Sequence, residues 1–412
     1  MIDASTTSAQ PQRLLFNPLE DTFINDPLPV MEAGLSLHPV VEHGVSLDPV
    51  YSLFRHEDIK RVLLDWKTFS SAPINSDLDA LNLGRATENF ILMDPPRHSR
   101  LRGLAQQGFF PAQMERFLPR AQRIAKERID YALTQSRFDL VNDISAQLTI
   151  GMITGILGLP VEDWPLIREW TNVMQRNTMA SFWLTQWDEA RAQGVARVTT
   201  EMADYFHDHL KRLRRQPKDD NILSVLLTTE LDGERFTAEE VESTAMLLLL
   251  AGNETTTNLI TNFVRCMVRY PDQYDLLKQR PDLIEAAIEE TLRLEPSLRM
   301  TIRSVMQDVE FHGTVIPAGN SVALWLLAAN RDPEIYDKPN VFDATLDRPR
   351  HLSFATGPHF CLGARLARME ARVAVEVLLE RVREIELLSN PVMSDNGVLN
   401  NVLSLDARFT AY

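Results

Sequence analysis

The sequence predicts a mainly α-helical protein with a minor β portion, folded as one domain. Three observations support this fold class. Between residues 96 and 294 apolar side chains recur with the 3.6-residue period of amphipathic helices. The chain holds only 16 glycines in 412 residues, which is few for a turn-rich all-β protein. After Leu294 the texture changes to short alternating segments with Gly and Pro punctuation.

Five segments of the helical stretch carry this periodicity, and they are 111–135, 140–157, 188–214, 238–269 and 283–294. The fourth exceeds 30 residues, so at 1.5 Å per residue it spans about 45 Å and must cross the middle of the protein. Residues 309–319 predict a β-hairpin, 362–381 a further helix, and 392–403 short strands.

Composition excludes several classes of protein. A formal net charge of −15 disfavours binding to nucleic acid or to anionic membranes. Two cysteines cannot form a disulfide framework, which favours a reducing compartment. The longest apolar run, 245–251, is far shorter than the roughly 20 residues of a membrane span. Residues 1–13 are polar and carry no targeting signal, so we expect a flexible tail, a single domain over 14–412, a cytoplasmic location and a monomer.

The segment 354–363 is the part of the sequence that indicates chemistry. Cys361 lies in a loop containing glycine and proline, directly ahead of a predicted helix. The positive end of a helix dipole and its free N–H groups lower a thiol pKa and stabilise a thiolate. Gly357 and Gly363 allow the backbone to approach whatever the sulfur binds.

Three interpretations of Cys361 are possible. A lone cysteine is most often a buried structural residue. It could be a nucleophile with His359 as its base, but two residues apart on one loop is poor geometry for that pair. The third interpretation is a thiolate ligand to haem iron. The other cysteine, Cys266, falls inside the long predicted helix and is interpreted as a packing residue.

The pattern Phe-x-x-Gly-x-His-x-Cys-x-Gly, followed by a helix, resembles the haem-binding loop of cytochrome P450. The resemblance covers nearly the whole chain. It implies the P450 fold, with haem b held between the long central helix and the cysteine loop. It also implies that Cys361 is the iron ligand, with Phe354, Gly357, His359 and Gly363 around the cofactor.

Further motifs follow in the order expected for this family. Residues 251–256 resemble its oxygen-activation motif, which implies that Ala251 adjoins the haem and that Glu254 and Thr255 deliver protons. The Thr255 hydroxyl can bond back to a carbonyl and open the helix locally into a water-filled kink.

Two other motifs imply haem and core contacts. His98 and Arg102, four residues apart on one helix face, resemble residues with which the family binds a haem propionate. Arg303 resembles another propionate-binding arginine of the family. Glu290 and Arg293 resemble the Glu-x-x-Arg motif that the family carries on a helix. Without the other motifs, this pair would be interpreted as a surface ion pair.

The chain departs from the family pattern at two places. Leu346 stands where an arginine usually completes the network of Glu290 and Arg293. Either Arg348 or Arg350 replaces it from a shifted position or the network is incomplete, and we favour replacement because a half-satisfied buried network is costly. Ala355 stands where glycine is common, and we expect little effect.

The resemblance implies a monooxygenase that inserts one oxygen atom from O₂ into a C–H bond of a small apolar substrate. The sequence has no P-loop and no Gly-x-Gly-x-x-Gly, so we expect electrons from a separate ferredoxin and ferredoxin reductase. The alternatives are a haem-thiolate sensor without turnover and a peroxide-driven peroxygenase. The acid–alcohol pair at 254–255 argues against both.

The resemblance also suggests where substrate and electron donor bind. The predicted pocket walls are Leu247, Leu250, Leu298 and Met300, and the apolar segment 174–187 resembles the family's mobile lid. Arg365, Arg368 and Arg372 recur on one side of the helix behind Cys361 and predict a docking patch for a ferredoxin, to which Arg97 and Arg100 would add charge.

Overall fold

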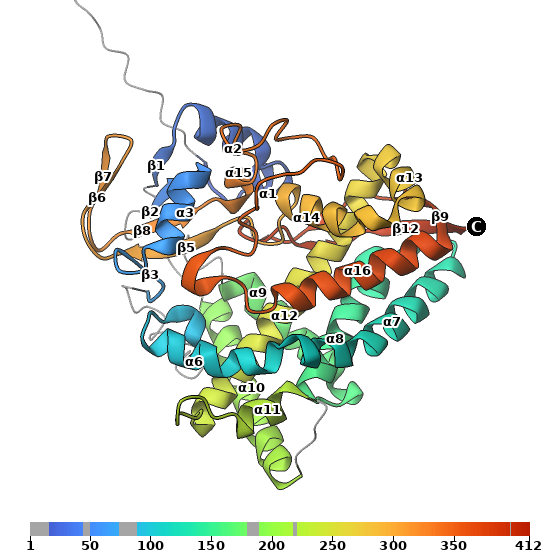
Figure 1. Ribbon diagram of the computed structural model, residues 1–412, viewed down its shortest axis with the longest axis horizontal. Helices are drawn as coiled ribbons and strands as arrows, with labels where there is room; N and C mark the ends of the chain where they lie inside the picture. Colours follow the sequence, from blue (N-terminus) through green and yellow to red (C-terminus); the bar gives the residue numbers. More distant parts are fainter. Residues whose placement is uncertain (1–15, 44–49, 74–88, 179–188, 217–220, 396) are drawn as a thin grey trace, which may run out of the picture.

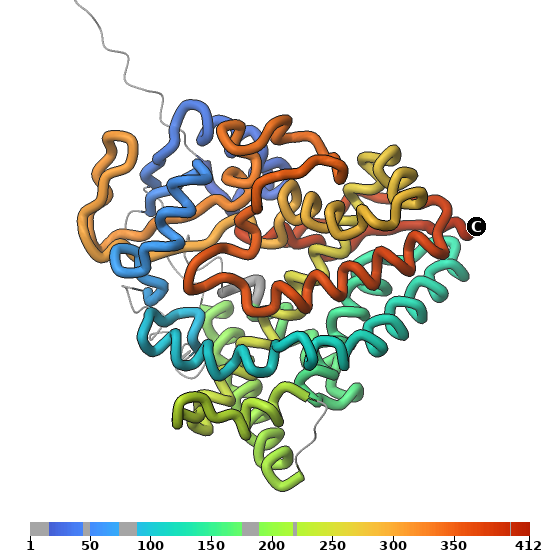
Figure 2. The backbone as a smooth tube through the Cα atoms, in the orientation of Figure 1, coloured from blue at the N-terminus to red at the C-terminus, as the bar shows by residue number. Residues whose placement is uncertain are grey.

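The computed structural model describes residues 16–43, 50–73, 89–178, 189–216, 221–395 and 397–412. The predicted tail at 1–13 and most of the predicted lid, from 179 onward, lie outside the described residues. Figure 1 shows the longer helices packed beside a smaller β portion, and Figure 2 traces the backbone through both.

The helical portion confirms the predicted fold class. Its main helices are α6 (Arg97–Gln106), α7 (Pro111–Leu133), α8 (Ala146–Leu157), α9 (Trp164–Thr178), α10 (Glu189–Arg215), α11 (Ile222–Thr228), α12 (Ala238–Arg269), α13 (Pro271–Gln279), α14 (Ile284–Leu294) and α16 (Ala364–Arg381). The shorter ones are α1 (Asp21–Asn25), α2 (Leu28–Ser36), α3 (His56–Leu64) and α15 (Leu326–Ala329). The predicted helix at 140–157 begins with a π-helical turn, Leu140–Ser145, before α8.

The central helix α12 has the bounds that the periodicity predicts. It begins with a capping box, because the Thr237 hydroxyl accepts from the Glu240 N–H at 3.2 Å while the Glu240 carboxylate accepts from the Thr237 N–H at 2.9 Å. It ends at Arg269, two residues before the proline that opens α13. It packs against α8, α10, α14 and α16, so it crosses the centre of the helical portion.

The β portion holds more structure than the sequence predicts. Its main sheet has the strand order β1-β2-β8-β5-β3, in which β2 (Val50–Leu53) and β8 (Ser321–Leu324) run parallel. The other strands of that sheet are β1 (Val40–His43), β5 (Thr301–Val305) and β3 (Phe69–Ser70). A second sheet joins β4 (Phe138–Asp139), β12 (Asp406–Ala411) and β9 (Val382–Leu387). The predicted hairpin is present as β6 (Val309–Phe311) and β7 (Thr314–Ile316), and β10 (Val392–Met393) pairs with β11 (Val402–Ser404).

The largest apolar core lies between α7, α8, α10, α12 and α16 and contains Cys266, which confirms its packing role. Among the described residues one stretch, Leu140–Leu157, is apolar enough by composition to span a bilayer, but most of it is buried inside the protein, chiefly against α7 and α12. The core thus fixes the two elements that frame the candidate site, α12 and the start of α16.

Candidate active site around Cys361

Cys361 lies in a tight loop between the 3₁₀ turn Gly357–His359 and the start of α16. Its backbone N–H donates to the Phe354 carbonyl at 2.9 Å, so the loop folds back on itself. In Figures 1 and 2 this loop lies at the end of α16 nearest the strands and α6. Leu362, the next residue, and Leu247 of α12 both pack against one small apolar cluster that includes Leu101 of α6, which places the loop and the central helix around the same cluster.

Several opposing effects set the charge of the thiol. Burial raises the pKa of the Cys361 thiol, whereas the backbone N–H groups of Gly363 and Ala364 and the guanidinium groups of Arg102 and Arg368 lower it. The predicted lowering by N–H groups at the start of the helix is present, but burial outweighs it and the net direction is upward. A half-buried thiol near backbone N–H donors and arginine cations nevertheless suits a metal ligand, because the metal supplies further positive charge.

The two glycines of the loop have different roles. Gly357 has φ 70°, and a Cβ there would lie 2.7 Å from the Leu63 carbonyl oxygen, so only glycine fits. A Cβ on Gly363 would meet nothing within 4 Å. The open space beside Gly363, next to the sulfur, is consistent with a bound cofactor.

Ala355 is strained, contrary to the expectation that it matters little. Its φ of 55° lies in the left-handed region, which costs an L-residue about 1–2 kcal/mol. The sequence could not show this, because the strain follows from the turn that the loop must make.

We expect Ala355→Gly to stabilise the protein by about 0.5–1 kcal/mol, since relief of the left-handed strain exceeds the entropy that glycine loses on folding. Chemical denaturation of the two proteins measures the difference. Ala367→Gly, within α16, is the matched control and should destabilise by about 1 kcal/mol. A destabilised Ala355→Gly protein would show that the methyl group's packing outweighs the strain.

The predicted propionate-binding residues meet next to the Cys361 loop. The rings of His98 and His359 lie 4.1 Å apart between centroids, and an Arg102 amino group donates to the Phe360 carbonyl. Burial is the main cause that lowers the pKa of both imidazoles, to about 4 for His98 and about 3 for His359. The nearby charges of Arg102 and Arg303 lower both pKa values further.

This cluster contains polar atoms without partners. Both ring nitrogens of His98, which is 1% exposed, and the Nε2 atom of His359 are buried and make no hydrogen bond to described residues. Buried polar atoms are costly unless they are paired, and two imidazoles and two guanidinium groups in one place favour an anionic partner. The residues therefore fit the propionates of a haem bound through Cys361.

On α12 the structure brings the predicted oxygen-activation residues to one face. Ala251 is exposed although it lies mid-helix, and the Thr255 hydroxyl donates to its carbonyl at 2.6 Å. The Thr255 carbonyl in turn accepts from the Ser297 hydroxyl at 2.6 Å. The helix is continuous through this motif, so the predicted local opening is not seen as a break in α12, and the side-chain bonds of Thr255 and Ser297 are added to it.

Glu254 is an acid whose proton is held more firmly than usual. Burial raises its pKa, and the Arg168 guanidinium of α9 partly opposes the shift. The shift favours the protonated form of the carboxyl, which is the form from which an acid donates its proton. Sequence reasoning missed Arg168 and Ser297, since only the fold brings them to α12.

Three of the four predicted pocket walls keep part of their surface exposed, and their role as walls stays a prediction. Leu247, Leu250 and Leu298 are partly exposed. Met300 is not a wall: it is 0% exposed and packs in the core with Trp325 and Val398, so that prediction is wrong. The reason is its place directly before β5, where the side chain points into the core beneath the main sheet.

The network around Glu290 is complete. Its carboxylate forms two hydrogen bonds with Arg293, at 2.7 and 2.8 Å, and lies 3.0 Å from Nε of Arg348. Arg348 therefore replaces the family arginine missing at Leu346, as expected. Arg350, the other candidate, is exposed and lies over the Phe360 ring at 4.6 Å.

The chain is similar to known proteins over most of its length. The family model described as Cytochrome P450 matches residues 34–404. The chain is 36% identical over 391 residues to the vitamin D(3) 25-hydroxylase of Pseudonocardia autotrophica, covering 93% of this chain and 92% of that protein. It is 36% identical over 351 residues to the monooxygenase PikC of Streptomyces venezuelae, covering 84% and 80%.

Solved structures show the same fold. P450BioI in complex with an acyl carrier protein ligated to hexadec-9Z-enoic acid superposes with a TM-score of 0.88 at 29% identity, covering 95% of this chain and all of that one. A testosterone complex of CYP109E1 from Bacillus megaterium gives a TM-score of 0.85 at 29% identity, covering 94% and 99%. With its thiolate loop, its cationic cluster and these relatives, the chain belongs to the cytochrome P450 family of haem monooxygenases.

Proposed function

We propose that this enzyme inserts one oxygen atom from O₂ into a C–H bond of a small apolar compound, with electrons from a separate ferredoxin and ferredoxin reductase. The supporting observation is the pairing of a half-buried Cys361 beside unpartnered imidazoles with the acid–alcohol pair Glu254 and Thr255 on α12. We further propose that it works in the cytoplasm as a monomer, with 14–412 as one haem-thiolate domain.

The residues of this chain would act as follows. Haem bound to the Cys361 thiolate supplies the activation of dioxygen. Arg102, Arg303, His98 and His359 would hold its propionates. The Thr255 hydroxyl donates its own hydrogen to the Ala251 carbonyl, which leaves its oxygen free to accept a second hydrogen bond.

Glu254 would supply the protons, since it is a titratable acid whose pKa burial raises and Thr255 follows it directly on α12. The aliphatic walls Leu247, Leu250 and Leu298 would keep the substrate side dry. These walls offer no charged group, which supports an apolar substrate. Relatives whose names or titles include vitamin D(3) and testosterone agree with that class.

The function is tested with the haem-loaded protein, a ferredoxin, a ferredoxin reductase and NADPH under ¹⁸O₂. A library of apolar ligands is first screened for spectral shifts, and the binders are then incubated. We expect one ¹⁸O atom in the product. An oxygen atom from peroxide alone, with no dependence on ferredoxin, would instead indicate a peroxygenase, and binding without any product would indicate a sensor.

Replacing Cys361 tests the thiolate ligand. The reduced wild-type protein with carbon monoxide should show the red-shifted Soret band of a thiolate-bound haem, and Cys361→Ser or Cys361→His should lose it completely, because neither side chain is a thiolate. Cys266→Ser is the matched control and should keep the band. Retention of the band in Cys361→Ala would show that the ligand is another residue.

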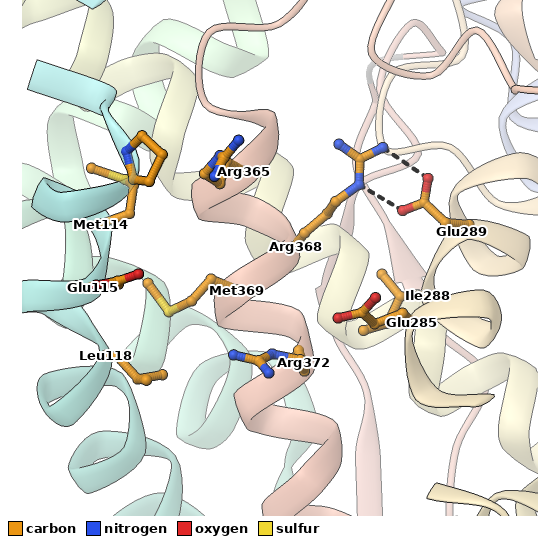
Figure 3. Close-up of a pocket in the computed structure, with 11 residues that line it drawn as sticks. Met114, Glu115, Leu118, Glu285, Ile288, Glu289, Arg365, Arg368, Met369 and Arg372 are labelled. Atoms are coloured by element: carbon orange, nitrogen blue, oxygen red, sulfur yellow. Dashed lines mark hydrogen bonds and ion pairs between the residues drawn. The ribbon is translucent and has the colours of Figure 1, made fainter. Parts of the chain in front are cut away.

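The proposed docking site for the ferredoxin is a groove of about 450 Å³ between α7, α14 and α16 (Figure 3). Its apolar floor includes Met114, Leu118 and Met369, and its rim includes Arg365, Arg368 and Arg372. The groove is not purely basic, because Glu115, Glu285 and Glu289 line it as well.

The predicted arginines differ in how free they are to meet a partner. Arg368 is bound to Glu289 at 2.7 and 2.8 Å, and Arg372 lies 3.7 Å from Glu376. Arg365 is exposed, and no ion pair joins it to a described acid. Arg100 does not add to the patch, since it binds Glu234 and Glu240 instead.

We therefore expect first-electron transfer from a ferredoxin to slow about tenfold from low to high ionic strength, since local charge steers the encounter. Stopped-flow reduction under carbon monoxide measures the rate. Arg365→Glu should lower the association rate and leave the substrate-induced spectral shift unchanged, whereas Arg215→Glu, at the far end of α10, should change neither. A rate insensitive to salt and to Arg365→Glu would place the docking site elsewhere.

A further inference from the structure

A chain of contacts connects the rim of the groove to the loop that holds Cys361. The Arg368 guanidinium, on α16, makes a bidentate bond to Glu289 of α14, at 2.7 and 2.8 Å. The same guanidinium lies over the Phe354 ring, with its central carbon 4.5 Å from the ring centroid. Phe354 is the residue whose carbonyl accepts the Cys361 N–H. One side chain thus contacts both a surface acid and the residue that braces the sulfur.

The surroundings of Glu289 allow it to hold the Arg368 guanidinium over the Phe354 ring. Its carboxylate also lies 3.3 Å from the ring of His351, which is buried. Burial alone would raise the pKa of Glu289, but hydrogen bonds from Arg368 and His351 lower it to about 2, so the group is ionised at any physiological pH. A bidentate bond to a permanent carboxylate fixes both the distance and the plane of the guanidinium.

We propose that Glu289 positions Arg368 over Phe354, so that the arginine cation stabilises the negative charge on Cys361 and sets the reduction potential of the haem. A fixed cation near a thiolate ligand favours the reduced iron, because reduction adds one negative charge to the site. Figure 3 shows the Arg368–Glu289 bond at the rim of the groove. The inference rests on haem binding through Cys361 and needs neither the proposed substrate nor the proposed electron donor.

Arg368→Met tests the charge, because methionine keeps an apolar contact with the ring and removes the cation. Arg372→Met is the matched control: it lies one turn along the same helix face and lines the same groove, but it pairs with Glu376. The midpoint potential of the haem-loaded, substrate-free protein is measured by dye-coupled titration. We expect Arg368→Met to lower the equilibrium constant for reduction about threefold, which is about 30 mV at 59 mV per decade, and Arg372→Met to change it little.

Glu289→Gln separates positioning from simple charge. Removing a carboxylate by itself favours reduction, so in the Arg368→Met background this change should raise the potential. In the wild-type background it also releases Arg368 from Phe354, so we expect the potential to fall there. Arg368→Lys keeps the charge and should recover most of the wild-type potential.

The proposal is overturned if Arg368→Met leaves the potential unchanged or if Arg372→Met lowers it equally, since either result would reduce Arg368 to an ordinary surface charge. A Glu289→Gln shift of the same sign in both backgrounds would overturn the positioning role. If Arg368→Met does not bind haem, Arg368→Gln and Arg368→Lys provide the same comparison of neutral and charged side chains. The carbon monoxide spectrum of each variant reports that the thiolate ligand is retained.

Discussion

Thr255→Ala is expected to bind haem and substrate normally but to release most reducing equivalents as hydrogen peroxide. Product formed per NADPH consumed should fall about tenfold or more, which is within the range that positioned acid–base groups contribute. The reason is geometric: the Thr255 hydroxyl is fixed by its bond to the Ala251 carbonyl, 2.6 Å away, and it is the hydroxyl nearest in sequence to the acid Glu254. Peroxide and product are measured in the same reaction.

Thr257→Ala is the matched control for this prediction. Its hydroxyl also donates to a helix carbonyl, that of Asn253 at 3.0 Å, but it lies on the face toward α8, where it is 2.6 Å from the Thr149 hydroxyl. The Thr257→Ala variant should be less stable than the wild-type protein, but its product formed per NADPH consumed should be unchanged. Glu254→Gln should slow turnover, since the relay loses its titratable group. An unchanged yield in Thr255→Ala would remove this hydroxyl from proton delivery.

The parts of this fold that could be predicted from the sequence are those set by local pattern. Periodicity predicts α12 with its observed bounds, because an amphipathic helix needs only its own residues to show which face is buried. The Cys361 loop was equally predictable, since its chemistry requires particular residues at fixed spacing within ten positions.

Features that depend on distant residues could not be predicted in this way. The main sheet was missed because β2 pairs in parallel with β8, 271 residues later, and no turn signal marks such a pairing. Met300 was misplaced for the same reason, since the core it enters is built from segments at both ends of the chain. The strain at Ala355 and the opposing effects on the Cys361 thiol likewise depend on the packed structure.

Glu290→Gln is expected to destabilise the protein by about 3–5 kcal/mol. The side chains of Glu290 and Arg293 are 4% and 2% exposed, and the carboxylate carries the charge that offsets both Arg293 and Arg348. Removing the carboxylate leaves buried arginine charges without a counter-charge. The loss of unfolding free energy is then much larger than the net stabilisation that an intact buried ion pair provides. Chemical denaturation with haem bound measures the change in unfolding free energy.

An exposed ion pair serves as the control for the buried pair of Glu290 and Arg293. Arg123 and Glu127 form an ion pair of similar length on the exposed side of α7, and Glu127→Gln should change stability by no more than the experimental error. In the Arg348→Gln background, Glu290→Gln should cost less than it does alone, because fewer buried cations are left without a counter-charge. Equal costs in both backgrounds would mean that Arg348 lies near Glu290 without sharing its charge, and that the arginine missing at Leu346 is not replaced.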